Sequence, residues 1–196
     1  MEITRDIARE VNLDVDEVGF KASMEEHKVQ SGAGKAFGSM GGDQVEVYRS
    51  AYEKLVENDQ LPRSGVKYNP YAWLEVDSRL IGLFSEGEEL EEAEQGTAVE
   101  VIVPQTGFYI ESGGQVSDTG TISALDDSWE IKVSDVRRPA AGIIIHIGTV
   151  SRGTARLNDQ VKLKVYRERR MDIMRNHTAT HLLHAQLHKV LGEHAR

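Results

Sequence analysis

The chain has 196 residues, no cysteine and a formal net charge of −9, which excludes disulfide bonds and thiolate chemistry within it. Its length suits one large domain or two small ones with a substantial core. The charged N-terminal stretch MEITRDIARE lacks the apolar segment of a signal peptide, and no apolar run reaches the roughly 18 residues of a membrane span, so we expect a cytoplasmic protein.

The charge is distributed unevenly along the chain. Residues 1–98 contain 10 Lys and Arg against 21 Asp and Glu, whereas residues 99–196 contain 13 against 11. Between Arg152 and Arg175 there are eight basic residues and three acidic ones. Ordinary surface variation explains this pattern, and so does a surface that contacts the phosphates of a nucleic acid.

The first part of the chain is predicted to be helical. Apolar residues recur at near-helical spacing in residues 2–11 and 15–30, which indicates two packing helices. Five glycines within residues 31–42 then indicate a linker or loop. A third helix is predicted over residues 43–58, where Val47, Ala51 and Leu55 share one face.

After Leu61-Pro62 the apolar pattern changes from helical to alternating, which predicts strands. Residues 71–76 and 80–84 are predicted to form a hairpin around Asp77-Ser78. The glutamate-rich residues 86–94 are most simply a solvated loop or a short helix. Further strands are predicted over residues 98–103, 130–136, 143–150 and 160–166. Several short strands at this spacing predict a small antiparallel β-barrel.

A glycine-rich stretch, TGFYIESGGQVSDTG, covers residues 106–120. The adjacent Gly113 and Gly114 permit positive φ angles and allow another backbone to approach closely. Ser112, Gln115 and Asp118 place short polar side chains around that opening. A tight turn that closes a hairpin and a loop that binds a ligand both explain this pattern.

The C-terminal stretch RNHTATHLLHAQLHKVL holds most of the histidines, since five of the seven in the chain lie in the last 20 residues. Asn176 is a favourable N-cap, so a helix is predicted to begin at His177. Such a helix places His177, His181, His184 and His188 within roughly 60° of one another. The His-x-x-x-His spacing lets two imidazoles reach one metal ion, but solvated histidines explain it equally well. A zinc protease is excluded, because Thr178 stands where that motif requires Glu.

Three stretches of the chain resemble alanyl-tRNA synthetases. NHTATHLLHAQLHKVLG resembles the first half of the metal-binding motif in their editing domain, which also occurs in free-standing alanyl-tRNA deacylases. FYIESGGQVSDTG is similar to the family signature FYAESGGQ-x-x-DTG, although Gly107 and Ile110 replace the usual Pro and Ala. EITRDIAREVNLDVDEVGFKASMEEHK resembles the segment that follows the aminoacylation domain. The matching stretches run from residue 2 to residue 194, and coverage is weakest over residues 31–98.

The resemblance implies a fragment of an enzyme that joins alanine to its tRNA, using ATP and Mg²⁺ in an N-terminal domain that we expect to be absent here. It also implies an editing domain that hydrolyses mischarged seryl- or glycyl-tRNA at a Zn²⁺ site. In the family, two metal ligands come from His-x-x-x-His and two from a later Cys-x-x-x-His. His177 and His181 match the first pair, and the second pair is expected beyond Arg196, which leaves half a site. His184 and His188 match no family role.

The expected fold is therefore α+β, with three parts. Residues 1–60 form a helical segment with a glycine-rich linker, and residues 61–167 form a barrel of the kind found in translation proteins. Residues 168–196 begin a truncated editing domain with a histidine-bearing helix.

The resemblance also implies contacts with tRNA, including mischarged forms of the alanine-specific tRNA. We assign no catalytic residue in the chain, and the chain alone should neither aminoacylate nor deacylate tRNA. Two alternatives stay open. One is a free-standing deacylase, although helical residues 2–58 argue against it. The other is a non-catalytic tRNA-binding module. Expected contacts to the tRNA end are Glu111, Gly113, Gly114 and Gln115, and expected phosphate contacts are Arg167, Arg169, Arg170 and Arg175.

Overall fold

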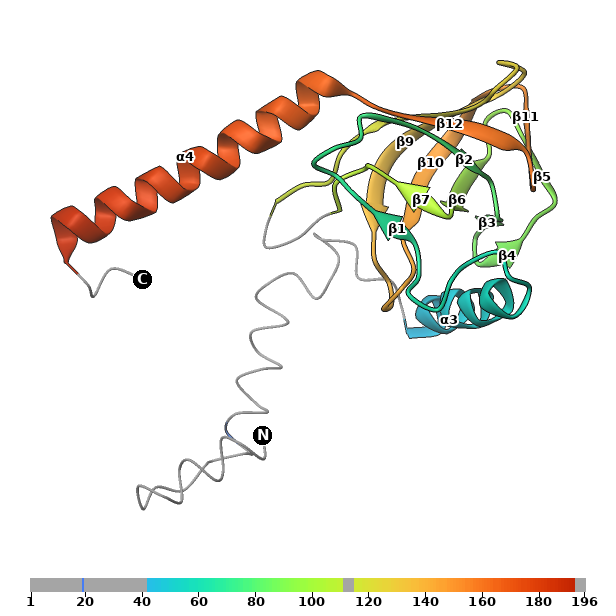
Figure 1. The fold of residues 1–196 in the computed structure, drawn as a ribbon, viewed down its shortest axis with the longest axis horizontal. Helices are drawn as coiled ribbons and strands as arrows, with labels where there is room; N and C mark the ends of the chain where they lie inside the picture. The colour runs from blue at the N-terminus through green and yellow to red at the C-terminus, as the bar shows by residue number, and fades with distance from the viewer. Residues whose placement is uncertain (1–18, 20–41, 111–114, 193–196) are drawn as a thin grey trace. The chain divides into compact units, whose positions relative to one another are not determined.

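The computed structural model describes Gly19, residues 42–110 and residues 115–192. The helices predicted over residues 2–11 and 15–30, and nearly all of the predicted linker, therefore lie outside the described residues. The chain divides into two compact units, Met1–Gly42 and Asp43–Arg196. The second unit contains a largely antiparallel sheet and a long C-terminal helix, preceded by a shorter helix (Figure 1).

The shorter helix, α3 (Gly42–Glu57), confirms the helix predicted over residues 43–58. Its buried Tyr48 packs edge-on against Phe84, with ring centroids 5.9 Å apart, and its hydroxyl donates a hydrogen bond to the Glu100 carboxylate. Burial and this carboxylate together raise the pKa of Tyr48. The tyrosine therefore joins α3 to the strands that carry Phe84 and Glu100.

The largest sheet has eight strands in the order β2-β12-β8-β9-β10-β6-β3-β4, and every ladder in it is antiparallel. Its strands are β2 (Glu75–Arg79), β3 (Gly82–Ser85), β4 (Glu88–Glu89), β6 (Ala98–Ile102), β8 (Gly120–Ala124), β9 (Glu130–Arg137), β10 (Ile145–Arg152) and β12 (Gln160–Val165). Two small sheets add the parallel pair β1 (Lys67–Tyr68) and β7 (Gln105–Thr106), and the antiparallel pair β11 (Thr154–Arg156) and β5 (Glu92–Glu94).

The alternating pattern of the sequence explains how the sheet builds its core. In β12, Val161, Leu163 and Val165 are buried, whereas Lys162 and Lys164 between them are exposed. Side chains alternate between the two faces of a strand, so one face of β12 packs inward and the other stays in water. Strands were correctly predicted where β6, β9, β10 and β12 lie.

Three sequence-based expectations for this region need correction. The ladders run in one open order from β2 to β4, and among the described residues none joins these two edges into a closed barrel. The hairpin around Asp77-Ser78 is wrong, because both residues lie within β2, which pairs with β12, while β3 pairs with β4 and β6. The glutamate-rich residues 86–94 contain β4 and β5.

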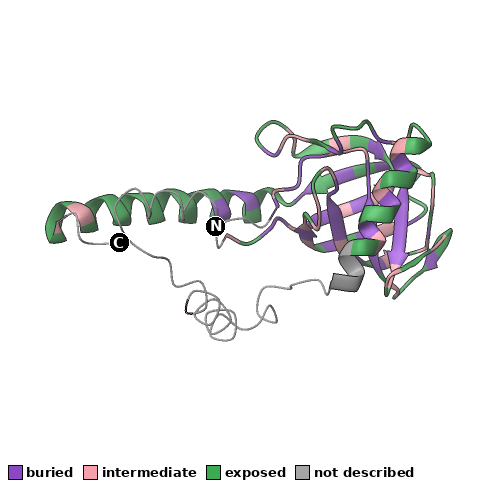
Figure 2. Ribbon diagram, turned by 90° about the horizontal axis from the view of Figure 1, so that it is seen from below, coloured by how far each residue is buried: buried purple, intermediate pink, exposed green. Residues whose placement is uncertain are grey.

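The C-terminal helix, α4 (Arg167–Leu191), begins ten residues earlier than predicted. Tyr166 alone separates β12 from α4, so the chain passes almost directly from the strand into the helix. Tyr166 is the N-cap residue and donates its backbone N–H to the Thr119 carbonyl oxygen. Asn176 lies inside the helix and is not its cap. Arg170 and Ile173 are buried, whereas the side chains beyond them are mostly exposed (Figure 2). None of the described helices is long and apolar enough to cross a membrane.

Candidate functional site

The glycine-rich stretch forms a loop whose two arms are joined to each other. The Tyr109 N–H donates to the Asp118 carboxylate at 2.6 Å, and the Asp118 N–H donates to the Tyr109 carbonyl oxygen at 3.0 Å. Residues 111–114, which include the predicted Glu111, Gly113 and Gly114, lie outside the described residues. The arms therefore hold Gln115 at a defined place beside the start of α4.

A buried histidine of the core, His146, is hydrogen-bonded to the start of this loop. His146 Nε2 lies 2.8 Å from the Thr106 hydroxyl, which accepts the Phe108 N–H at 3.1 Å. Its Nδ1 lies 3.3 Å from the Val101 carbonyl oxygen. These partners place the ring proton on Nδ1, so that Nε2 accepts from Thr106. Burial lowers the pKa of His146 to about 4, which keeps the ring neutral near pH 7.

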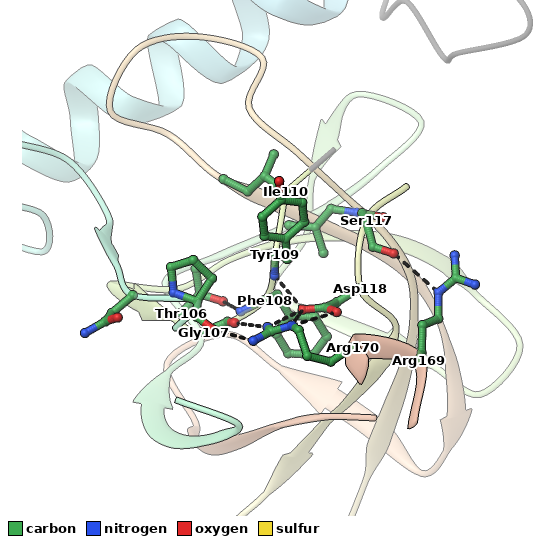
Figure 3. Close-up of polar contacts among 12 residues, drawn as sticks. Thr106, Gly107, Phe108, Tyr109, Ile110, Ser117, Asp118, Arg169 and Arg170 are labelled. Carbon is green, nitrogen blue, oxygen red and sulfur yellow. Dashed lines mark hydrogen bonds and ion pairs between the residues drawn. The ribbon is translucent and has the colours of Figure 1, made fainter. Parts of the chain in front are cut away.

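The start of α4 is fixed to the loop through Arg170. Its Nε lies 2.9 Å from Oδ2 of Asp118 and 3.1 Å from Oδ1, and both side chains are buried (Figure 3). Its terminal nitrogens donate to the Gly107 carbonyl oxygen at 2.7 Å and to the carbonyl oxygen of Pro70. We call this set of contacts the Arg170 anchor. Three separate chain segments meet at one guanidinium, whose fork of donors suits such convergence.

Beyond the anchor, the loop also contacts the first histidine of α4. The side-chain amide nitrogen of Gln115 contacts Nδ1 of His177, although the two residues are 62 positions apart. A cavity of about 240 Å³ opens beside this contact. It is lined by Pro70, Tyr71, Tyr109, Gln115, Arg170, Ile173, Met174, His177 and Thr178. One predicted site residue from each motif, Gln115 from the first and His177 from the second, therefore borders the same small cavity.

The four helical histidines form two similar pairs. The Nε2 atoms are 3.0 Å apart in His177–His181 and 3.1 Å apart in His184–His188. Two nitrogen ligands of one tetrahedral zinc ion lie roughly 3.3 Å apart, given bonds of about 2.0–2.1 Å, so either pair needs only a small adjustment to bind one ion. In the described part of the chain, no group of three or more possible ligands comes together. The cavity borders the first pair alone, through His177.

The arginines predicted to contact phosphates lie in two kinds of environment. Arg167, Arg169 and Arg175 have exposed positions on α4, with Arg175 paired to Asp172 at 3.0 Å. Arg169 also donates to the Ser117 carbonyl oxygen at 3.4 Å. Arg170 is buried, and carboxylate and carbonyl oxygens surround its guanidinium.

Sequence reasoning did not find the Arg170 anchor or the tyrosines of the cavity. Arg170 lies within a run of basic residues, and its partners are 52, 63 and 100 positions away. No local spacing links such residues. Asp118 offered a partial signal, because it is the one acidic residue between the glycine pair and β8 in the loop.

Sequence comparisons identify the family to which this chain belongs. Residues 1–169 match the family model of tRNA synthetases class II (A), so the chain belongs to that class. Within the class, its relatives place it in the alanyl-tRNA synthetase family.

The relatives are alanine–tRNA ligases, and the matches cover essentially all of this chain. The enzyme of Chloroflexus aurantiacus is 38% identical over 195 residues, which cover 100% of this chain and 20% of the relative. That of Acetivibrio thermocellus is 38% identical over 200 residues, covering 99% and 21%. That of Myxococcus xanthus is 39% identical over 197 residues, covering 100% and 21%. The chain thus spans about one fifth of the length of these relatives.

Proposed function

We propose that this chain is the part of an alanine–tRNA ligase that presents the end of tRNA to an editing site. The complete protein would ligate alanine to its tRNA with ATP and hydrolyse mischarged seryl- or glycyl-tRNA. Family membership supports this role, and the contact between Gln115 and His177 carries it. That contact joins the glycine-rich loop to the histidine motif at the edge of a cavity.

In this proposal His177 and His181 supply two ligands of a zinc site, and residues outside this chain supply the others. When bound, the metal would polarise the ester or activate water. A histidine that binds metal through Nε2 carries its proton on Nδ1, where a neighbouring acceptor orients the ring. The Gln115 side chain offers that acceptor through its amide oxygen, because an amide presents either end to a partner.

The exposed arginines of α4 would bind tRNA phosphates. Arg167, Arg169 and Arg175 are accessible on the helix, whereas Arg170 is already bound to Asp118. We therefore assign the phosphate contacts to the three exposed residues and a positioning role to Arg170. In the same scheme, residues 61–167 act as a β-domain and residues 168–196 open the editing domain, with α4 continuous across the boundary.

Zinc titration of the purified chain tests the metal assignment, with elemental analysis after dialysis. We expect weak binding, most of which His181→Ala removes. His188→Ala is the matched control, because His184–His188 has nearly the same geometry but lies away from the Gln115 cavity. Equal loss in both variants would show that zinc binds at any histidine pair of α4. Zinc that survives dialysis at one ion per chain would contradict the half-site.

Titration with the alanine-specific tRNA tests the phosphate contacts. Binding should weaken as salt rises, with a slope of about 0.9 in log K per phosphate contacted. Arg167→Glu should weaken binding and lower this slope by about one. Lys132→Glu makes the same charge change at an exposed position of β9 and should have a smaller effect. Salt-independent binding would contradict the phosphate contacts.

Hydrolysis assays separate this role from a free-standing deacylase. With two of the metal ligands lying elsewhere, we expect the chain alone to leave seryl-tRNA intact. Hydrolysis that a chelator inhibits and His181→Ala abolishes would favour the deacylase. Tight tRNA binding, together with no metal binding by either histidine pair, would favour a non-catalytic binding module.

A further inference from the structure

Tyr71 is the most exposed of the large hydrophobic side chains in the described residues, with 90% of its surface accessible. Such a side chain usually lies on a mobile loop tip, but the backbone around Tyr71 is held. The preceding residue, Pro70, is buried, and its carbonyl oxygen accepts from Arg170. Asn69 accepts the Ala72 N–H at 3.3 Å and donates its own N–H to the Thr106 carbonyl oxygen at 3.1 Å.

The stretch KYNPYAWL, which comprises β1 and the loop that carries Tyr71, contains three aromatic residues that differ in what covers their faces. The Arg138 guanidinium lies 5.3 Å from the ring centre of Tyr68, and the Lys67 ammonium lies 5.2 Å from that of Trp73. Both distances are within the range of a cation–π contact. Among the described residues, no cation lies over Tyr71, so its ring faces remain accessible.

Tyr71 lines the cavity beside Gln115 and His177, together with a second tyrosine, Tyr109. Tyr109 is held by the hydrogen bonds of the loop, and the walls between the two are largely apolar, with Ile173 and Met174 from α4. At about 240 Å³ the cavity is smaller than the roughly 300–1,000 Å³ typical of sites for drug-sized ligands. Its size suits one planar ring system.

We propose that Tyr71 is a stacking platform for one unpaired nucleobase of an RNA strand, which enters the cavity between Tyr71 and Tyr109. Single-stranded RNA is typically bound by stacking its bases on aromatic side chains while cations contact the phosphates. Here the cations are the exposed arginines of α4, the helix that forms one wall of the cavity. This inference rests on the proposed tRNA-binding function and specifies where a base, as distinct from the backbone, is recognised.

Stacking predicts a dependence on bases that charge alone does not give. The test compares a single-stranded RNA of twelve nucleotides with the same strand made of abasic ribose units, which carries the same number of phosphates. We expect the protein to bind the strand with bases at least about fivefold more tightly, the lower end of what one stacked base contributes. Fluorescence anisotropy with end-labelled strands measures both affinities at one salt concentration.

Three variants locate the stacked base. Tyr71→Ala should reduce the preference for bases to less than about twofold, because it removes the ring. Tyr71→Phe keeps the ring and loses only the hydroxyl, so its preference should match that of the unmodified protein. Tyr166→Ala removes another exposed tyrosine, one that does not line the cavity, and should leave the preference unchanged. Circular dichroism of each variant checks that the fold is intact.

The outcomes separate this inference from the function on which it rests. If both strands bind equally and salt weakens both, the phosphate contacts stand and the stacking platform is wrong. If Tyr71→Ala keeps the full preference for bases, the platform lies elsewhere and the assignment is again overturned. If no RNA binds at any salt concentration, the proposed tRNA-binding function fails as well.

Discussion

The two ends of α4 differ sharply in how the rest of the protein supports them. Near its start, Arg170 and Ile173 are buried, and Arg170 is held by three chain segments. Farther along, Leu182 and Leu183 are exposed by 64% and 61%. The fold holds the helix mainly through the turn from Arg170 to Ile173, and apart from the contact of His177 with Gln115 the histidines lie on its mostly exposed part. Disturbing the anchored turn should therefore affect the site far more than changes near the end of the helix.

Removing the Arg170 anchor should have the largest effect on stability. Arg170→Met leaves the Asp118 carboxylate buried without its partner, which costs about 3–5 kcal/mol. Arg175→Met breaks the exposed pair with Asp172 on the same helix and should cost less than about 1 kcal/mol. Urea denaturation of both variants measures the difference. Equal costs would mean that the anchor does not stabilise the fold.

The histidine of the core, His146, should make stability depend on pH. The folded pKa of His146 is about 4 and its ordinary value is 6.5, so the unfolded chain takes up the proton first as pH falls. The contribution of His146 to the free energy of unfolding is therefore fully present above pH 6.5 and is lost as pH drops to about 4. At about 1.4 kcal/mol per pH unit, that loss is about 3 kcal/mol.

Urea denaturation between pH 7.5 and 4 tests this dependence by comparing variants with the unmodified protein. Carboxylates titrate in the same range, so the difference between profiles is the informative quantity. His146→Gln should flatten the profile between pH 6.5 and 4. A profile that keeps its full slope in this variant would show that another group causes the pH dependence.

Gly107 should be intolerant of any side chain, because the loop approaches its neighbour closely there. A Cβ atom at this position would lie 2.2 Å from the Trp73 carbonyl oxygen. Gly107→Ala should therefore force the backbones apart and cost about 1–3 kcal/mol, as overpacking does. Gly87→Ala is a control, since no atom lies within 4 Å of its would-be Cβ, although its positive φ of 85° adds a smaller strain. Thermal unfolding of both variants measures the ranking.

The smallest effects are expected at the aliphatic residues of α4, where a buried position is compared with an exposed one. Ile173→Val removes one buried methyl group and should cost about 0.5–1.5 kcal/mol. Leu187→Ala removes more atoms but at a position 41% exposed, so the change should stay within about 0.5 kcal/mol. A larger cost for Leu187→Ala would show that the chain covers this face in solution, for example by self-association, which light scattering would detect.

The sequence predicted those parts of the fold in which a local pattern matches the contacts. β12 alternates between buried and exposed residues, so its period is visible without knowing its neighbours. The hairpin around Asp77-Ser78 failed because Asp and Ser favour turns, whereas in the structure Asp77 lies opposite Lys162 on the exposed face of the sheet. The antiparallel ladder between β2 and β12 outweighs that local preference.

The candidate site was predictable only as far as the motifs reach. Gln115 and His177 were found because each lies in a stretch with a family resemblance, and the structure brings them into contact. The beginning of α4 was missed because residues 167–175 are mostly charged and lack an apolar period, which made Asn176 look like the first cap. Arg170 cannot be distinguished from its neighbours by type, since only its partners across the fold separate it from Arg169.

The Arg170 anchor also has a consequence for the rates of folding. Its contacts span 52, 63 and 100 residues, and such separations make it a late event, because closing long loops costs entropy before the contact forms. We therefore expect it to be largely absent from the transition state. Arg170→Met should speed unfolding and leave refolding nearly unchanged in stopped-flow measurements. α4 would then be the first element to come loose when the protein opens.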